Sequence, residues 1–177
     1  MEHLSGHTGH LRRLGEVLSA YTDRALARFG GRLVSVVLFG SCARGTANVS
    51  SDIDLLVVAE GLPTDRWARQ EINIRLSREL EPLLDDIARE TTWYPYLSVI
   101  LETPDEARRF HRIYLDMVEE SRLLYDRDDF FTSVLESVKR KIAELGAKRI
   151  QVGEKWYWDL IPDFKPGKVI DLLPTLR

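Results

Sequence analysis

The chain has 177 residues, of which 44% are hydrophobic and 30% are charged, a composition suited to one packed, soluble domain. Its formal net charge of −3 lacks the basic excess of a general DNA or RNA binder, so a long nucleic acid is not the expected partner. No apolar run approaches the roughly 20 residues of a membrane helix, and residues 1–13 lack the apolar core of a secretion signal. We therefore expect a cytoplasmic protein without a membrane partner.

The first third of the chain indicates one helix followed by two strands. Apolar residues recur at steps of three and four over residues 8–29, as in an amphipathic helix, with Thr8 as a suitable N-cap. Residues 32–39 form a β-branched apolar run, and residues 53–59 repeat that pattern after a polar loop. A strand-loop-strand unit is predicted.

The middle of the chain predicts a second helix and a third strand. The helix covers residues 65–88, with Thr64 as its N-cap, and it is interrupted near Pro82 because proline lacks an N–H and its ring clashes with the preceding turn. A short apolar run over residues 96–101 is typical of a strand.

The second half is expected to be mostly helical. Thr103, Pro104 and Glu106 have the spacing of a capping box with proline at the first helical position, which predicts a helix as far as about residue 124. An acidic turn follows, and then an amphipathic helix from residue 130 that Gly146 ends.

These elements predict an α/β (α+β) fold, a small mixed sheet flanked by helices with a C-terminal helical extension. We expect three regions. Residues 1–102 form the core, residues 103–146 form C-terminal helices packed on it, and residues 147–177 form an irregular, aromatic-rich tail. The cluster Trp156-Tyr157-Trp158 is expected to dock this tail on its own domain, because such side chains bury large areas.

The start of the second strand carries two carboxylates. Asp52 and Asp54 are two residues apart, so a strand points both to one face while Ile53 and Leu55 point to the other. Two adjacent anions are stable only beside a cation. Oxygen ligands of this kind suit Mg²⁺ or Mn²⁺, and the chain has no Cys/His set with zinc-finger spacing. The alternative is that the two aspartates only cap a turn.

A possible phosphate site follows the first strand. Gly40-Ser41 turns the chain into a short helical stretch, where unpaired backbone N–H groups and a hydroxyl form a cradle for phosphate oxygens. Arg44 is expected either to contact phosphate or to pair with Asp52 or Asp54. Gly45 suits a left-handed end to the turn, and a helix N-terminus would lower the thiol pKa of Cys42, the single cysteine.

Together these residues resemble a known family. Gly40-Ser41, ten residues, and then Asp52-Ile53-Asp54 are similar to the signature of the DNA polymerase beta-like nucleotidyltransferase superfamily. The full stretches over residues 40–45 and 51–57 most resemble its minimal prokaryotic nucleotidyltransferase branch. The resemblance covers residues from roughly 10 to 102.

The resemblance implies a mixed sheet with helices and a metal-dependent transfer of a nucleoside monophosphate from an NTP, expected to be ATP, to a hydroxyl. Gly40, Ser41 and Arg44 would contact the nucleotide phosphates. Asp52 and Asp54 would be the catalytic residues and the ligands of two Mg²⁺ ions, or of Mn²⁺. The acceptor would be a small molecule or a protein, such as a HEPN-type toxin.

The family's third carboxylate has no clear counterpart. The predicted third strand contains no acid; Ser98 stands where one is expected, and Glu102 follows the strand. Glu102 either reaches the site or is a solvated residue before the Thr103 cap. Without a third acid, the alternative function is an antitoxin-like protein that binds a nucleotide or a partner with a degenerate catalytic site.

Overall fold

The computed structural model describes residues 3–91, 93–153 and 155–162, and the side chains from residue 13 onwards within them. A mixed sheet lies at its centre, with strand order β3-β2-β1-β4. Strand β1 pairs antiparallel with both β2 and β4, whereas β2 and β3 are parallel. The bounds of these strands are β1 Leu33–Phe39, β2 Ile53–Ala59, β3 Leu97–Glu102 and β4 Arg122–Asp126.

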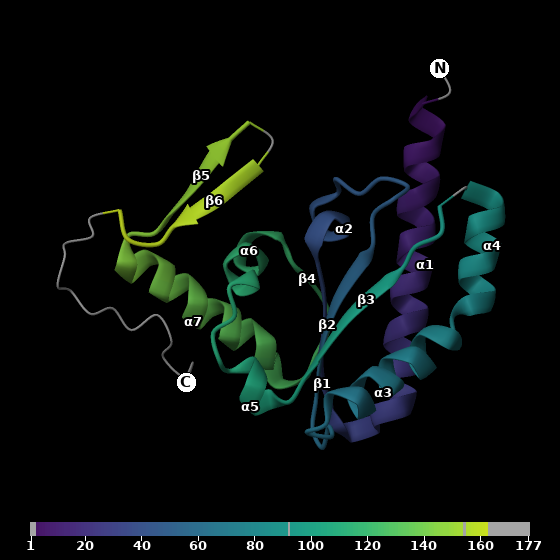
Figure 1. Ribbon diagram of the computed structural model, residues 1–177, viewed down its shortest axis with the longest axis horizontal. Helices are drawn as coiled ribbons and strands as arrows, with labels where there is room; N and C mark the ends of the chain where they lie inside the picture. The colour runs from purple at the N-terminus through teal and green to yellow at the C-terminus, as the bar shows by residue number, and fades with distance from the viewer. Residues whose placement is uncertain (1–2, 92, 154, 163–177) are drawn as a thin grey trace.

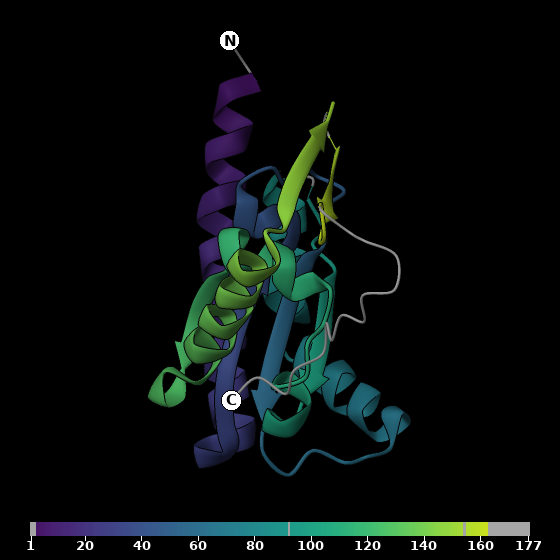
Figure 2. The ribbon, with the colours of Figure 1, turned by 90° about the vertical axis from the view of Figure 1, so that its left-hand side faces the viewer.

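Helices cover both faces of this sheet (Figures 1 and 2). One layer consists of α1 (His3–Phe29), α3 (Arg66–Arg78) and α4 (Glu81–Thr91). The other layer consists of α5 (Pro104–Ala107), α6 (Ile113–Glu120) and α7 (Phe130–Leu145). The short helix α2 (Gly40–Arg44) joins β1 to β2, and a separate hairpin is formed by β5 (Lys148–Val152) and β6 (Lys155–Asp159). This is the mixed sheet with flanking helices that the sequence predicts.

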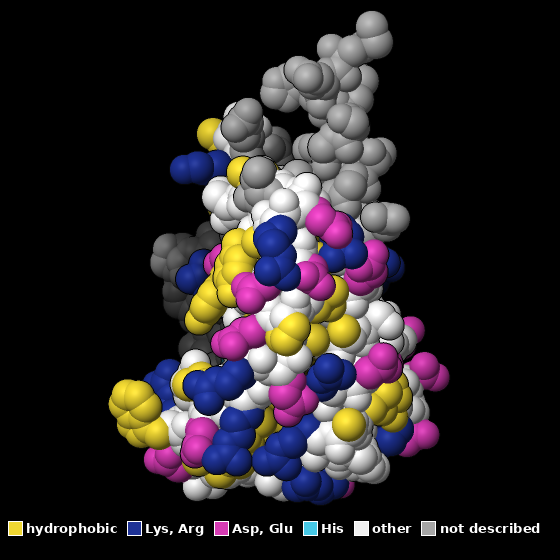
Figure 3. Space-filling view, turned by 90° about the vertical axis from the view of Figure 1, so that its right-hand side faces the viewer, with side chains coloured by type: hydrophobic (Ala, Val, Ile, Leu, Met, Phe, Trp, Pro, Cys, Tyr) yellow, Lys and Arg dark blue, Asp and Glu magenta, His cyan; other side chains and the backbone are white. Residues whose placement is uncertain are grey.

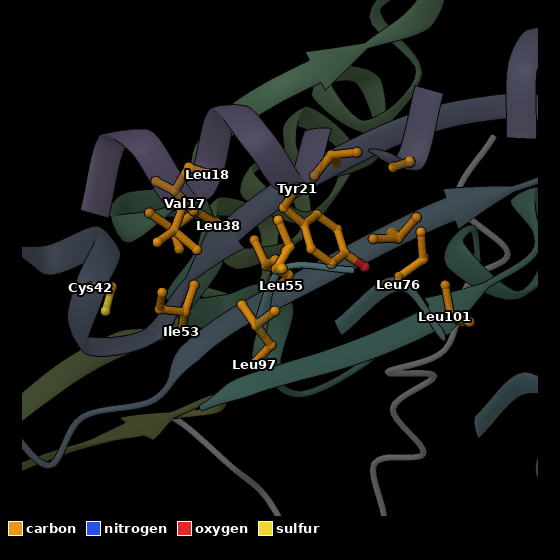
Figure 4. Packing of buried hydrophobic residues seen from close by; sticks show 14 of the residues in the cluster. Val17, Leu18, Tyr21, Leu38, Cys42, Ile53, Leu55, Leu76, Leu97 and Leu101 are labelled. Carbon is orange, nitrogen blue, oxygen red and sulfur yellow. The ribbon is translucent and has the colours of Figure 1, made fainter. Parts of the chain in front are cut away.

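The core divides at the sheet because strand side chains alternate between its faces. From β2, Ile53 and Leu55 pack towards α1, α3 and α4, whereas Leu56 and Val58 pack towards α5, α6 and α7. Figure 4 shows the first of these clusters, in which Tyr21 of α1 lies among apolar side chains of the sheet and of α3. Strand β2 is therefore buried from both sides, and only its ends are accessible.

The helices begin at other residues than predicted. Helix α1 begins at His3, five residues before the predicted cap Thr8. The predicted break in the second helix is real, but Pro82 lies in the first turn of α4, where a missing N–H is tolerated. The N-cap of α3 is Asp65, which accepts a hydrogen bond from the Ala68 N–H, rather than Thr64.

The prediction of one helix from residue 103 to 124 is wrong. The capping box of Thr103 and Glu106 is present, but α5 ends at Ala107, and the chain then forms α6 and β4. Strand β4 is favoured because β1 would otherwise leave an unpaired edge. Asp126 completes the arrangement, since its carboxylate accepts hydrogen bonds from the Ser35 hydroxyl and from the Phe131 N–H at the start of α7.

The part of the C-terminal region that the structure describes is also more regular than predicted. A β5–β6 hairpin replaces an irregular tail over residues 148–159, while residues 163–177 lie outside the described residues. The last predicted helix is confirmed, and Gly146 ends it in the left-handed region with a φ of 64°. The division of the chain into three regions stays a prediction, although β4 adds a strand from the middle region to the sheet.

The face over α1, α3 and α4 carries mixed charge. Figure 3 shows Lys and Arg side chains interspersed with Asp and Glu there, in keeping with the small net charge. Exposed hydrophobic groups include Trp67, which is 83% exposed on α3. Among the described residues, no helix is long and apolar enough to cross a membrane.

One ion pair links α3 to the start of α5. Arg69 Nη1 lies 2.8 Å from Glu106 Oε2 and Arg69 Nη2 lies 3.0 Å from Glu106 Oε1, so the contact is bidentate. Glu106 Oε2 also accepts the Thr103 N–H at 2.7 Å. The Arg69 hydrogen bonds are the main reason that the pKa of Glu106 is lowered to about 2. The capping box is thus tied to a second element.

We predict that Glu106→Gln lowers the free energy of unfolding by about 1–2 kcal/mol at pH 7, because it removes the negative charge from a bidentate ion pair and weakens the hydrogen bonds that the side chain accepts. A lowered pKa stabilises the fold fully above the unfolded-state pKa, near 4.3, and that contribution disappears as the pH falls towards 2. Urea denaturation at pH 7, 4 and 3 should therefore show that the difference in unfolding free energy between wild type and variant decreases as the pH falls.

The exposed α3 pair of Glu71 and Arg75 gives a matched control. Glu71→Gln should change the unfolding free energy by less than about 0.5 kcal/mol. Equal losses of unfolding free energy in the two variants would contradict a stabilising role for the Glu106–Arg69 ion pair. A loss in Glu106→Gln that does not depend on pH would also contradict it.

Candidate active site

The loop between β1 and β2 brings a backbone turn against a carboxylate. Phe39, the last residue of β1, pairs with Asp54 in β2, and Gly40 follows with a φ of 71°. A Cβ atom at Gly40 would lie 2.2 Å from Asp54 Oδ2, closer than any real contact. Glycine is therefore required here for two reasons, its positive φ and the close approach of Asp54.

The turn after Gly40 forms the expected short helix. Phe39 occupies the N-cap of α2 and provides no side-chain hydrogen bond, so the first N–H groups of the helix have no side-chain cap. Such N–H groups attract anions. Gly45 ends α2 in the left-handed region with a φ of 72°, as predicted. The short helix is confirmed, and phosphate binding at Gly40-Ser41 stays a prediction.

The two carboxylates lie where the strand periodicity predicts. Ile53 and Leu55 are fully buried in the core cluster on the α1 side, which leaves Asp54 on the opposite face of β2. Burial raises the pKa of Asp54, a hydrogen bond from Ser98 opposes that rise, and the negative charge of Asp52 adds to it. Asp52 is exposed at the rim. A cation beside the two carboxylates would offset this repulsion.

The chemistry of this donor set fits a hard divalent ion. Mg²⁺ commonly uses only one or two protein carboxylates and completes its shell with water and substrate phosphates. The described residues contain no cluster of three or more His, Cys, Asp or Glu side chains able to hold a metal. A site of two aspartates beside an anion-attracting turn suits an ion that arrives with a phosphate ligand, and Asp52 and Asp54 are the residues that would hold it.

Arg44 pairs with a residue that the sequence did not suggest. Its Nη1 atom donates a hydrogen bond to Glu120 Oε2 at 3.3 Å, and its guanidinium lies 5.0 Å from the ring centre of Trp156. The expected pairing with Asp52 or Asp54 is not formed. Arg44 is nevertheless close enough for its charge to lower the pKa of Asp54. Glu120 and Trp156 come from α6 and the hairpin, and no local motif could have identified them.

The third strand places Ser98, not an acid, beside Asp54. Ser98 is the register partner of Asp54, and its side chain donates a hydrogen bond to it. Glu102 is opposite Val58, about 13 Å further along the strand. It is only 7% exposed, accepts a hydrogen bond from the Tyr114 hydroxyl at 2.8 Å and lies 3.3 Å from His111 Nε2. Of the two roles left open for Glu102, neither applies, because it is a buried residue of the fold.

Cys42 does not have the lowered pKa expected of a helix N-terminus. It is buried in the core, and burial is the main reason that the pKa of its thiol rises to about 11. Its Sγ donates a weak hydrogen bond to the Asp52 carbonyl oxygen at 3.2 Å. Cys42 therefore packs the loop and is not a nucleophile.

Known proteins resemble this chain over most of its length. The sequence model of the nucleotidyltransferase domain family matches residues 22–165. A curated relative from Methanocaldococcus jannaschii, "Putative protein adenylyltransferase MJ1305", is 32% identical over 154 residues, which are 84% of this chain and 95% of the relative.

Two solved structures are each 21% identical to the chain. One is described as a toxin-antitoxin with AMP-PNP; the match covers 71% of this chain and 90% of the other, with a TM-score of 0.41. The second is a "putative nucleotidyltransferase" from Sulfolobus solfataricus, with 70% and 89% covered and a TM-score of 0.43.

We predict that Gly40→Ala loses more stability than Gly45→Ala. Both residues have a positive φ near 71°, so both variants carry the same backbone strain, about 1–2 kcal/mol. Only at Gly40 does the added Cβ meet a side chain, Asp54; at Gly45 nothing lies within 4 Å. Denaturant unfolding of the two variants isolates the contact, and equal losses would show that Asp54 moves aside freely.

We also predict that Glu102→Gln melts at or above the wild-type temperature at pH 7. The amide oxygen still accepts from Tyr114, and a buried charge is removed. Burial raises the pKa of Glu102, so the wild type is most stable below the unfolded-state pKa and loses stability as the pH rises. The difference in melting temperature between the variant and the wild type should thus become smaller by pH 4. A melting temperature of the variant far below that of the wild type at pH 7 would contradict the prediction.

Proposed function

The chain belongs to the nucleotidyltransferase domain family, and we propose that it transfers AMP from ATP to a hydroxyl of a protein acceptor, with Mg²⁺ or Mn²⁺ as the metal. The observation that carries the proposal is the contact between the Gly40 turn and Asp54. It brings a phosphate-binding turn and a metal-binding carboxylate pair to one point, which a phosphoryl-type transfer requires.

Each residue of the loop has a role in this proposal. The backbone N–H groups at Gly40 and Ser41 and the Ser41 hydroxyl bind phosphate oxygens, and Arg44 adds a forked cation. Asp52 and Asp54 would hold the metal. A divalent ion bound there would lower the pKa of the attacking hydroxyl and neutralise phosphate charge. The hydrogen bond from Ser98 favours the ionised form of the Asp54 carboxylate.

The reaction is an in-line displacement at the α-phosphorus. The acceptor oxygen forms the new bond to phosphorus and gives its proton to solvent, while the bond from phosphorus to the oxygen that bridges to the β-phosphate breaks and pyrophosphate leaves. Gly40, Ser41 and Arg44 hold the leaving group by its charged oxygens. Most of the catalysis by this chain is therefore positioning and charge stabilisation.

A groove lies beside Ser98, the register partner of Asp54. It has a volume of about 410 Å³ and runs between α3 and the residues before β3, with Asn73, Ile74, Tyr94 and Tyr96 among its lining. The side-chain oxygen of Asn73 is buried there without a hydrogen-bond partner. We assign this groove to the acceptor because its lining includes Ser98, the strand neighbour of Asp54.

The curated relative's name favours a protein acceptor over a small molecule. A HEPN-type toxin is the partner we propose, in keeping with the family branch. The second candidate function is nucleotide binding without turnover, which one observation favours: Ser98 stands opposite Asp54 where the resemblance implies a third acid.

The test is incubation with α-labelled ATP and Mg²⁺ or Mn²⁺, with the purified toxin-type partner or a host lysate, following labelled protein and pyrophosphate. We expect label on a discrete protein. Asp54→Asn and Asp52→Asn should each reduce transfer at least about a hundredfold, since metal-held charge stabilisation is worth several kcal/mol. Asp85→Asn, an exposed acid on α4, is the control and should leave transfer unchanged.

This assay distinguishes the two candidate functions, nucleotide transfer and nucleotide binding without turnover. Metal-dependent binding of ATP with no transferred label from any NTP would replace the transferase by the binding protein. Transfer that survives the Asp52→Asn/Asp54→Asn double variant would remove the proposed metal site altogether.

A further inference from the structure

The hairpin residue Trp156 contacts the arginine of the phosphate loop. Its ring centre is 5.0 Å from the guanidinium carbon of Arg44 and 4.1 Å from that of Arg149. We infer that Trp156 is a positioning residue, which holds Arg44 ready for the nucleotide phosphates and so contributes to ATP affinity. This inference rests on the proposed function, and it gives the C-terminal hairpin a part in the active site.

Helix α6 fixes the hairpin in place. Trp156 and Trp158 both donate their indole N–H to Asp116 Oδ1, each at 2.9 Å. Both side chains lie on one face of β6 because they are two residues apart, while Tyr157 between them is exposed. The single carboxylate of Asp116 therefore sets the position of two indole rings.

A second carboxylate of α6 joins the two arginines. Glu120 accepts from Arg44 at 3.3 Å through Oε2 and from Arg149 at 2.5 Å through Oε1. Glu119 takes a further contact from Arg149 at 2.9 Å. The Trp156 ring and the Glu120 carboxylate thus hold Arg44 from two directions, and Arg149 completes the cluster.

This arrangement suits a phosphate-binding arginine for a physical reason. A free arginine side chain loses rotamer freedom when it binds a ligand, whereas one already held by an aromatic ring and a carboxylate has lost that freedom in advance. Glu120 engages only Nη1 of Arg44, so other N–H donors of the fork are left for a ligand. The Arg44 side chain is 25% exposed and lines a cavity between α2 and the hairpin, together with Thr46, Arg149 and Trp156.

The test is a double-mutant cycle on ATP binding, with calorimetric titration of ATP and Mg²⁺ into the full chain. Trp156→Leu should raise the Kd for ATP about tenfold, the range of a partly desolvated cation–π contact. Arg44→Ala should raise it at least as much. Because Trp156 acts through Arg44, the Arg44→Ala/Trp156→Leu double variant should bind no more weakly than Arg44→Ala alone.

Two further variants separate positioning from simple stability. Trp158→Leu removes the other indole that binds Asp116 but has no contact with Arg44 in the described structure, so it should lower the melting temperature without changing the Kd. Trp156→Phe keeps an aromatic face and should recover most of the affinity. In turnover, Trp156→Leu should raise the KM for ATP and leave kcat within about twofold.

Several outcomes would overturn the inference. One is a Trp156→Leu effect that adds in full to that of Arg44→Ala, and another is an equal loss of affinity in Trp158→Leu. Binding of ATP that is normal in Trp156→Leu would also overturn it. If the wild type binds ATP but transfers nothing, the proposed transfer fails while the cycle still decides the role of Trp156; if the wild type binds no nucleotide, both fail.

Discussion

The site depends on one close approach, that of the Gly40 backbone to the Asp54 carboxylate. Strand β1 ends opposite Asp54, so the chain turns where the second strand presents a partly buried carboxylate. Any side chain at Gly40 would displace Asp54, and any shift in the register of β1 and β2 would separate the turn from the carboxylate. The pairing of β1 with β2, the geometry of the Gly40 turn and the position of Asp54 therefore depend on one another.

Features that depend on neighbouring residues could be predicted from the sequence, whereas features that depend on residues far apart in the chain could not. The capping box at Thr103, the glycine stop at Gly146 and the two apolar strands are encoded by neighbouring residues, and they appear in the structure. Strand β4 is not encoded in this way. The predicted helix extends to about residue 124, but residues 122–126 form a strand because β1 offers a free edge and Asp126 binds the Phe131 N–H at the start of the next helix.

The residues of the candidate site differ in the same way, between those set by a short local stretch and those set by distant packing. Gly40, Ser41, Asp52 and Asp54 lie within one short stretch, and strand periodicity alone puts the two aspartates on one face. The choice between Ser98 and Glu102 could not be made from sequence, because it depends on the register between β2 and β3. The partners of Arg44 depend on how α6 and the hairpin pack, and the only hint was the alternation of Trp156 and Trp158.

The two layers of helices consequently differ in whether they contact the residues of the candidate site. Asp54 and Arg44 meet the layer that contains α6, whereas α1, α3 and α4 cover the face of β2 that carries only apolar side chains. Substitutions in the core of α1 act on the site only through global stability. Changes at Asp116 or Glu120 alter the groups that hold Arg44 and the hairpin, so they reach the phosphate loop directly although neither residue belongs to the sequence motif. The short motif contains the proposed reactive groups, and contacts from α6 and the hairpin hold its arginine.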